Sequence, residues 1–239
     1  MNRLLVGALG CLLSFNVLSA SWVINKDHSE IMFKVSYLNV SELTGRFTEY
    51  SGLVELDEGK KSFGKISITI LTDSADTGHK MRDNHLEAHE FFNSREFPKL
   101  TFVSTEVKNV GKDKYSAKGD LTIKGITKPS AITFTLTDSV KDTWGYENKF
   151  AKFEAVVNRK DFNLNWNKTL DGSKYLVGDD VTVWGVFQIQ PSKGVTPSSK
   201  HMIPDTEYIR GRDDELRKET PREEESTISK KLRKLINGK

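Results

Sequence analysis

Ile31-Met32-Phe33-Lys34-Val35-Ser36-Tyr37 places a branched or aromatic side chain at every second position, and this alternation decides the fold class. Successive side chains of a β-strand point to opposite faces, so the stretch predicts a strand with one apolar face. Periodicity alone does not say whether that face is turned toward the inside of the molecule.

The same period of two recurs along the chain from Trp22 to Gln190 and replaces the 3.6-residue spacing of helices. The further stretches are Phe47–Leu56, Ile66–Ile70, Leu100–Val107, Ala117–Ile123, Ile132–Leu136, Phe153–Val157 and Val181–Ile189. The sequence therefore predicts an all-β domain of about eight strands.

Segments that favour chain reversal separate many of these stretches, which predicts antiparallel neighbours. They are Asp57–Gly59, Asn109–Asp113, Gly125–Pro129 and Val177–Asp180. Closure of about eight antiparallel strands into a barrel removes exposed edges and leaves room for side chains or for one ligand. We expect a barrel, with a β-sandwich as the alternative.

One stretch, Asp76–Asn93, lacks the alternation. Asp76 or Thr77 could cap a helix there, so one or two short helices are predicted near residues 77–93. Its apolar side chains are expected to pack inward, as a lid at one end of the barrel. These side chains are Met81, Leu86, Phe91 and Phe92.

The first twenty residues, Met1–Ala20, contain one basic residue, an apolar run and a small-residue exit, as a secretory signal peptide does. A membrane anchor is the alternative, but the run is short for a spanning helix. Cys11 is the only cysteine and lies inside this run, so the mature chain would contain no disulfide and no thiolate metal site. We expect a periplasmic or secreted protein with a barrel domain over residues 21–191.

Residues 192–239 are rich in charged residues and are expected to form a mostly disordered tail. Apolar residues at helical spacing within 227–237, with lysines around them, indicate a short basic amphipathic helix. This helix could make weak contact with a membrane surface, or it could be a frayed, solvated tail. The formal net charge of +3 over 239 residues gives no reason to expect a nucleic-acid partner.

Several ordered motifs give the chain from Trp22 to about Pro191 a family resemblance. They are Asp27–Phe33, Thr44–Phe47, Arg82–Leu86 with Glu90-Phe91-Phe92, Phe97–Thr105, Gly119–Pro129 and Asn158–Phe162. With these motifs the chain resembles the YceI family of exported, lipocalin-like polyisoprenoid-binding proteins. Asn163 stands where the family pattern has a glycine, and the charged tail lies outside the pattern.

The resemblance implies an antiparallel barrel with a deep apolar cavity that holds a polyisoprenoid or another long-chain amphiphilic lipid. It implies carriage, storage or sequestration of that lipid and requires no cofactor. A solid core filled by side chains is the alternative that the strand pattern leaves open. Whether two barrels pair as a homodimer is also left open.

The residues expected to face inward and contact the lipid are the apolar members of the alternating strands. They are Ile31, Phe33, Val35, Phe47, Ile66, Ile68, Ile70, Leu121, Ile123, Ile132, Phe134, Leu136, Phe153, Phe187 and Ile189.

Arg82, Asp83 and His85 form the polar group with the chemistry for proton transfer or headgroup binding. No nucleophile accompanies them, so we expect them to tie the lid to the barrel, and an enzyme acting on a lipid is the alternative function. His85 and His89 are four apart and, with His79, Asp83 and Glu90 nearby, are of the right type to bind a metal, but no known metal motif is present, so no metal site is expected. A third interpretation is a solid interaction module recruited through its tail.

Overall fold

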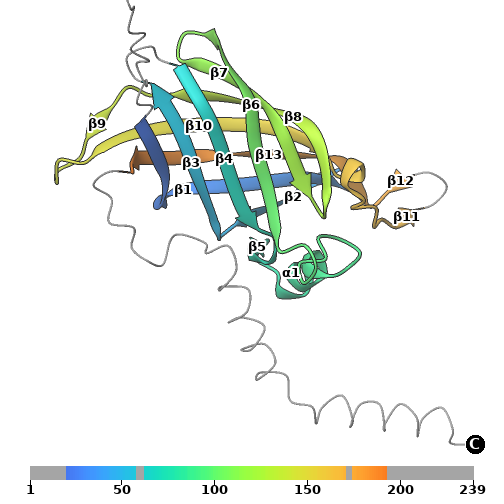
Figure 1. The fold of residues 1–239 in the computed structure, drawn as a ribbon. Helices are drawn as coiled ribbons and strands as arrows, with labels where there is room; N and C mark the ends of the chain where they lie inside the picture. The colour runs from blue at the N-terminus through green and yellow to red at the C-terminus, as the bar shows by residue number, and fades with distance from the viewer. Residues whose placement is uncertain (1–19, 58–61, 171–173, 193–239) are drawn as a thin grey trace, which may run out of the picture.

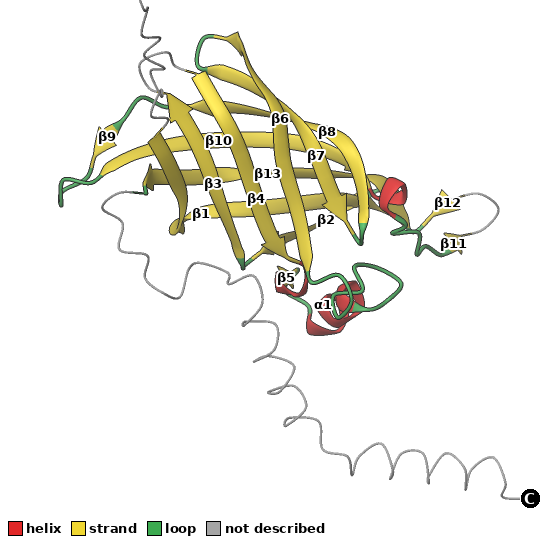
Figure 2. Cartoon of the chain, in the orientation of Figure 1, coloured by secondary structure: helices red, strands yellow, loops and turns green. Residues whose placement is uncertain are grey.

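The computed structural model describes residues 20–57, 62–170 and 174–192 of the chain. Strands make up most of these residues, and the helical turns lie at the barrel's periphery (Figure 2). The elements are β1 (Ala20–Tyr37), β2 (Ser41–Phe47), β3 (Tyr50–Asp57), β4 (Ser62–Leu71), η1 (Thr72–Ser74), β5 (Ala75–Asp76), α1 (Lys80–Glu87), β6 (Lys99–Gly111), β7 (Lys114–Ile123), β8 (Ile126–Leu136), β9 (Val140–Lys141), β10 (Glu147–Asn158), η2 (Arg159–Phe162), β11 (Thr169–Leu170), β12 (Lys174–Tyr175) and β13 (Val177–Pro191).

Eight strands close into an antiparallel barrel, as predicted. The order around the barrel is β1-β13-β10-β8-β7-β6-β4-β3 and back to β1. Closure depends on β1, which pairs with β3 through Ala20–Val23 and with β13 along most of its length. The second half of β1 pairs with β2 instead of β3. Since each strand has two partners, the barrel leaves few backbone groups unpaired.

The wall is incomplete on one side. β8 and β10 pair only between Thr133–Leu136 and Ala151–Glu154. The first part of β8, Ile126–Ile132, is hydrogen-bonded only to β7. Pro129 lies within this edge, where its missing N–H costs no ladder hydrogen bond. The edge of β8 that lacks a β10 partner therefore lies toward the end of the barrel where α1 lies (Figure 1).

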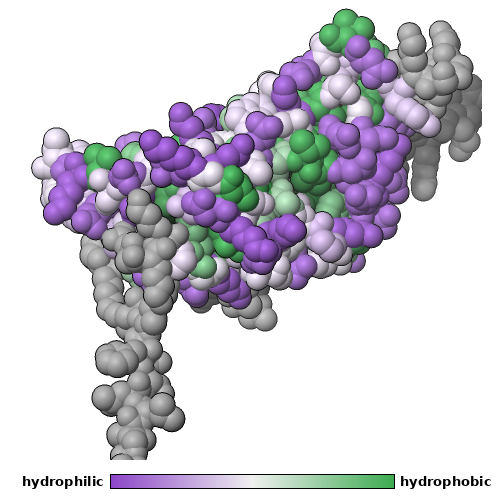
Figure 3. Space-filling model, turned by 90° about the horizontal axis from the view of Figure 1, so that it is seen from above, coloured by the Kyte–Doolittle hydropathy of each residue, from purple (hydrophilic) through white to green (hydrophobic). Residues whose placement is uncertain are grey.

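Polar side chains cover most of the outer face seen in Figure 3, with separate apolar spots between them. The buried residues are mainly apolar side chains on the inward faces of the strands, with Trp22 and Ile31 among the most completely buried. Within the described part of the chain, no helix has the length and apolar composition needed to cross a bilayer.

The predicted helix is found as α1, but its details differ from the prediction. His79 is the N-cap, and its side chain accepts a hydrogen bond from the Arg82 N–H, so neither Asp76 nor Thr77 caps it. Met81 was expected to pack inward, yet 78% of it is exposed. Because neighbouring helical residues point in different directions, packing Arg82 and Leu86 against the lumen turns Met81 outward.

Two boundary predictions were wrong. The expected strand Phe47–Leu56 is divided, since Phe47 ends β2 and the chain turns before β3 begins at Tyr50. The expected turn at Val177–Asp180 belongs to β13, where Asp180 pairs with Asn158 of β10. Tertiary strand pairing outweighs the turn-forming composition there. The signal peptide predicted over Met1–Ala20 lies outside the described residues apart from Ala20, and the tail helix predicted at 227–237 lies wholly outside them, so both stay predictions.

Candidate functional site

A cavity of about 570 Å³ occupies the interior of the barrel. Every barrel strand contributes inward side chains to it, and α1 and the loop after η2 add more. All fifteen residues predicted to face inward line this cavity, so the inward face was identified correctly; contact with a ligand stays a prediction. The volume falls within the roughly 300–1,000 Å³ typical of small-molecule sites.

Small side chains keep the middle of the lumen open. Ala151 and Ala155 of β10 and Ala117 of β7 line the cavity beside larger residues. An aromatic cluster fills the end away from α1: the ring centroids of Phe63 and Tyr115 are 4.9 Å apart, and those of Phe63 and Phe134 are 5.3 Å apart. Aromatic side chains therefore line the lumen at this end, and Phe33, Phe47 and Phe92 do so toward α1.

Three aromatic side chains meet at the α1 end of the lumen. The rings of His85 and Trp166 lie edge to face with centroids 4.9 Å apart, and Phe91 packs on both, at 4.9 Å from His85 and 5.4 Å from Trp166. His85 and Phe91 belong to the α1 segment, whereas Trp166 follows η2. This contact joins two segments far apart in sequence, and all three residues line the cavity; we call this end of the lumen the mouth.

Arg82, Asp83 and His85 of α1 each have a structural partner. Asp83 accepts hydrogen bonds from the N–H and the hydroxyl of Thr77, at 2.9 and 2.5 Å. Arg82 donates to the Thr77 hydroxyl and carbonyl, at 2.7 and 2.8 Å. His85 Nε2 lies 2.8 Å from a carboxylate oxygen of Glu90. Arg82, Asp83 and His85 thus bind to Thr77 and Glu90 rather than to one another, and they fix the shape of the lid.

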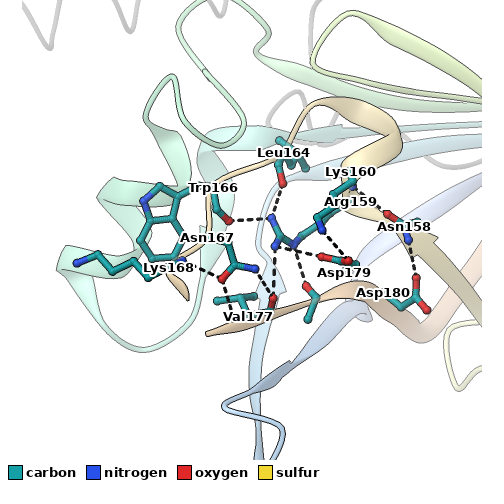
Figure 4. Close-up of polar contacts among 11 residues, drawn as sticks. Asn158, Arg159, Lys160, Leu164, Trp166, Asn167, Lys168, Val177, Asp179 and Asp180 are labelled. Carbon is teal, nitrogen blue, oxygen red and sulfur yellow. Dashed lines mark hydrogen bonds and ion pairs between the residues drawn. The ribbon is translucent and has the colours of Figure 1, made fainter. Parts of the chain in front are cut away.

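Arg159 holds the other side of the mouth in place, and only 4% of it is exposed. Its guanidinium donates to the carbonyls of Gly178, at 2.8 Å, and Trp166, at 2.9 Å, and to that of Leu164 (Figure 4). Burial lowers the pKa of Arg159, and the nearby Asp179 carboxylate opposes this shift. A rigid fork of donors therefore ties the loop that carries Trp166 to β13.

The backbone conformation at position 163 explains why asparagine can stand where the family pattern has a glycine. It ends η2 with φ of 56°, in the left-handed region that glycine and asparagine adopt most readily. Lys124 lies close by and donates to the carbonyls of His89, at 2.7 Å, and Asn163, at 3.4 Å. The β7–β8 turn is thereby linked to both the lid segment and the loop after η2.

The sequence interpretation missed part of the lining. Leu164, Trp166 and Leu176 line the cavity, but they lie in segments without alternation. A large aromatic residue isolated between asparagines, as in Asn165-Trp166-Asn167, is the only local signal for them. No cluster of three or more metal-ligating side chains occurs within residues 20–57, 62–170 and 174–192.

An eight-stranded antiparallel barrel with an apolar lumen and a short helical lid defines a lipocalin-like barrel protein. The family model described as YceI-like domain matches residues 22–189. The chain belongs to the YceI family.

Individual relatives agree with this assignment. A UPF0312 protein of Enterobacter sp. (strain 638) is 40% identical over 169 residues, which cover 68% of this chain and 86% of the relative. The crystal structure of the Campylobacter jejuni YCEI protein has a TM-score of 0.56 at 25% identity, covering 65% of this chain and 88% of that one. A polyisoprenoid binding domain from Saccharophagus degradans shares the fold, with a TM-score of 0.52 at 14% identity, covering 72% of this chain and 99% of that one.

Proposed function

We propose that this protein holds a polyisoprenoid or a similar long-chain amphiphile in its lumen and carries, stores or sequesters it after export to the periplasm or outside the cell. The observation that carries the proposal is the apolar cavity of about 570 Å³, lined mainly by aliphatic and aromatic side chains. The family resemblance and the signal-like Met1–Ala20 segment support it.

Burial of the chain supplies the affinity in this proposal. Each methylene transferred from water contributes about 0.8 kcal/mol, so some twenty carbons give a gross term above ~10 kcal/mol. Association costs of roughly 4–15 kcal/mol oppose this term. A charged clamp is not required, because the gross term is large enough for useful affinity.

A series of linear fatty alcohols of increasing length tests the proposal. Affinity should rise about fourfold with each added methylene and then level off once the lumen is full. Competition against the fluorescent probe 12-(9-anthroyloxy)stearate measures each affinity. A flat series, or a purified protein whose organic extract never contains a long-chain amphiphile, would contradict the proposal.

A matched pair of variants on β10 locates the binding. Ala155 lines the cavity, whereas its neighbour Val156 is exposed on the outer face. Ala155→Phe should reduce probe binding sharply because it fills the lumen, whereas Val156→Phe should bind as the wild type does. Thermal unfolding of both variants checks that each is folded.

Enzymatic action on the lipid is not favoured by the contacts of Arg82, Asp83 and His85, because each is engaged by Thr77 or Glu90. We therefore propose binding without turnover. Neither the wild type nor His85→Ala should convert a bound lipid into another compound. Conversion by the wild type that is lost in the variant would instead show that the protein is an enzyme.

A further inference from the structure

Three strongly exposed apolar side chains lie around the mouth. Val40, in the turn between β1 and β2, is 90% exposed; Met81 on α1 is 78% exposed; Tyr175 on β12 is 51% exposed. Single exposed apolar residues are normal on protein surfaces. These three differ in that each comes from a separate segment that borders the opening of an apolar lumen.

Contacts between neighbouring elements place the three segments around the mouth. The Leu38 N–H donates to the Leu176 carbonyl at 2.9 Å, so the β1–β2 turn lies beside β12. Arg46 of β2 pairs with Asp76, just before α1, at 3.0 Å. The contact between His85 and Trp166 completes the ring. We call the exposed residues Val40, Met81 and Tyr175 the mouth rim; Figure 1 shows α1 and β12 projecting from the same end of the barrel.

The charges next to the mouth rim are partly unbalanced. Lys80 and Lys168 are exposed and have no carboxylate partner among the described residues. Among the carboxylates nearby, Glu90 lies against His85 and Glu42 pairs with Lys34, whereas the exposed Asp161 has no ion pair within the part of the chain that the structure describes. Free lysines beside exposed apolar side chains are the combination that binds the surface of an anionic bilayer.

The shape of the mouth rim and the apolar nature of the proposed cargo favour a bilayer over a protein as the partner of this surface. The mouth rim consists of separate side chains on a turn, a helix and a short strand, whereas a protein interface needs a continuous, well-packed patch. Such side chains can enter the soft boundary between headgroups and acyl chains. A long-chain lipid that crossed water to reach the lumen would expose all its apolar surface, at about 0.8 kcal/mol per methylene.

We propose that the mouth rim docks on a lipid bilayer and holds the mouth against the membrane while cargo enters or leaves. The inference rests on the proposed function for the identity of the cargo. The apolar side chains insert at the interface, and Lys80 and Lys168 contact anionic headgroups.

Flotation of the full chain with large unilamellar vesicles of phosphatidylethanolamine and phosphatidylglycerol tests the docking. The rim variant combines Val40→Asp, Met81→Asp and Tyr175→Asp. The control variant combines Val110→Asp, Val140→Asp and Trp144→Asp, three residues that are also exposed but lie at the opposite end of the barrel. Since binding scales with inserted apolar area, the rim variant should partition about tenfold or more weakly than the wild type, and the control within about twofold of it.

Equal partition of the rim variant and the wild type would overturn the proposal, and so would absence of wild-type binding. The C-terminal tail is present in all three proteins, so binding carried by the tail would appear as equal partition. Uptake of 12-(9-anthroyloxy)stearate from vesicle-free buffer separates this inference from the proposed function. Normal uptake without docking refutes the docking alone, whereas docking without any uptake refutes the lumen as a lipid site.

Discussion

Replacement of Arg159 by Met should destabilise the whole barrel domain. The guanidinium donates to the carbonyls of Leu164, Trp166 and Gly178 and lies within 3.4 Å of Asp179. Methionine fills a similar volume but offers no donor, so these acceptors lose their partners in a site that is almost fully buried.

The expected loss is about 3 kcal/mol of the free energy of unfolding. Each buried acceptor left without a donor costs about 1–3 kcal/mol, and the lower end applies here because water can reach a loop at the mouth. A domain of this size loses roughly 2–4 °C of melting temperature per kcal/mol, so the midpoint should fall by about 6–12 °C. The stability of Arg159→Lys should lie between those of the wild type and Arg159→Met, because a single ammonium group cannot donate to all the carbonyls that the planar guanidinium contacts together.

Urea unfolding followed by tryptophan fluorescence and circular dichroism measures these differences. Arg46→Met is the matched control, since Arg46 makes an exposed pair with Asp76 and should leave the midpoint nearly unchanged. The reasoning is refuted if Arg159→Met costs less than about 1 kcal/mol, or if Arg159→Lys matches the wild type.

Three further predictions concern single positions. Asn163→Gly should keep or slightly raise stability, whereas Asn163→Val should cost about 1–2 kcal/mol in urea unfolding, because its φ of 56° disfavours branched side chains. Burial, with smaller contributions from the charges of Glu30 and Glu49, raises the pKa of Tyr50 to about 12. Its neutral phenol therefore stabilises the fold below the ordinary tyrosine pKa, and this contribution is lost as pH rises through the folded value; absorbance titration should show one late-titrating phenol that Tyr50→Phe removes. Gly119→Ala should lower the melting temperature, because the new methyl would meet the Val103 carbonyl, whereas Gly111→Ala meets only the Lys114 side chain at 3.7 Å and should be tolerated.

The strands and their inward face could be predicted because alternation is a local property of the sequence. Ile31, Phe33 and Val35 face the cavity as their spacing requires. The start of β13 could not be predicted in this way, since Gly178 and Asp179 resemble a turn until the pairing with β10 and the contacts of Arg159 are known. Long-range contacts decide such segments, and the composition of a short window does not contain them.

The outward direction of Met81 has a similar cause. The sequence predicted that four apolar residues of the Asp76–Asn93 stretch all pack inward. The helix α1 has only two turns, however, and it directs Arg82, His85 and Leu86 toward the lumen. The polar contacts of Arg82 and Asp83 with Thr77 fix that orientation. A hydrogen-bonding pattern specific to Thr77 therefore selects which apolar residues are buried, and hydropathy alone could not show it.

Whether the barrel is hollow depends on the sizes of the inward-facing side chains, and the alternation of apolar and polar residues does not determine those sizes. Phe or Leu in place of Ala151 and Ala155 would satisfy the same pattern and would fill the lumen. Each methylene that such a larger residue would bury in the lumen contributes about 0.8 kcal/mol, and alanine lacks this contribution. Small residues at these positions therefore reduce stability unless something else fills the space. On the proposed function, a lipid that binds only the folded barrel would supply those contacts and stabilise the domain in proportion to the logarithm of its concentration, so small lining residues would exchange packing for cargo binding.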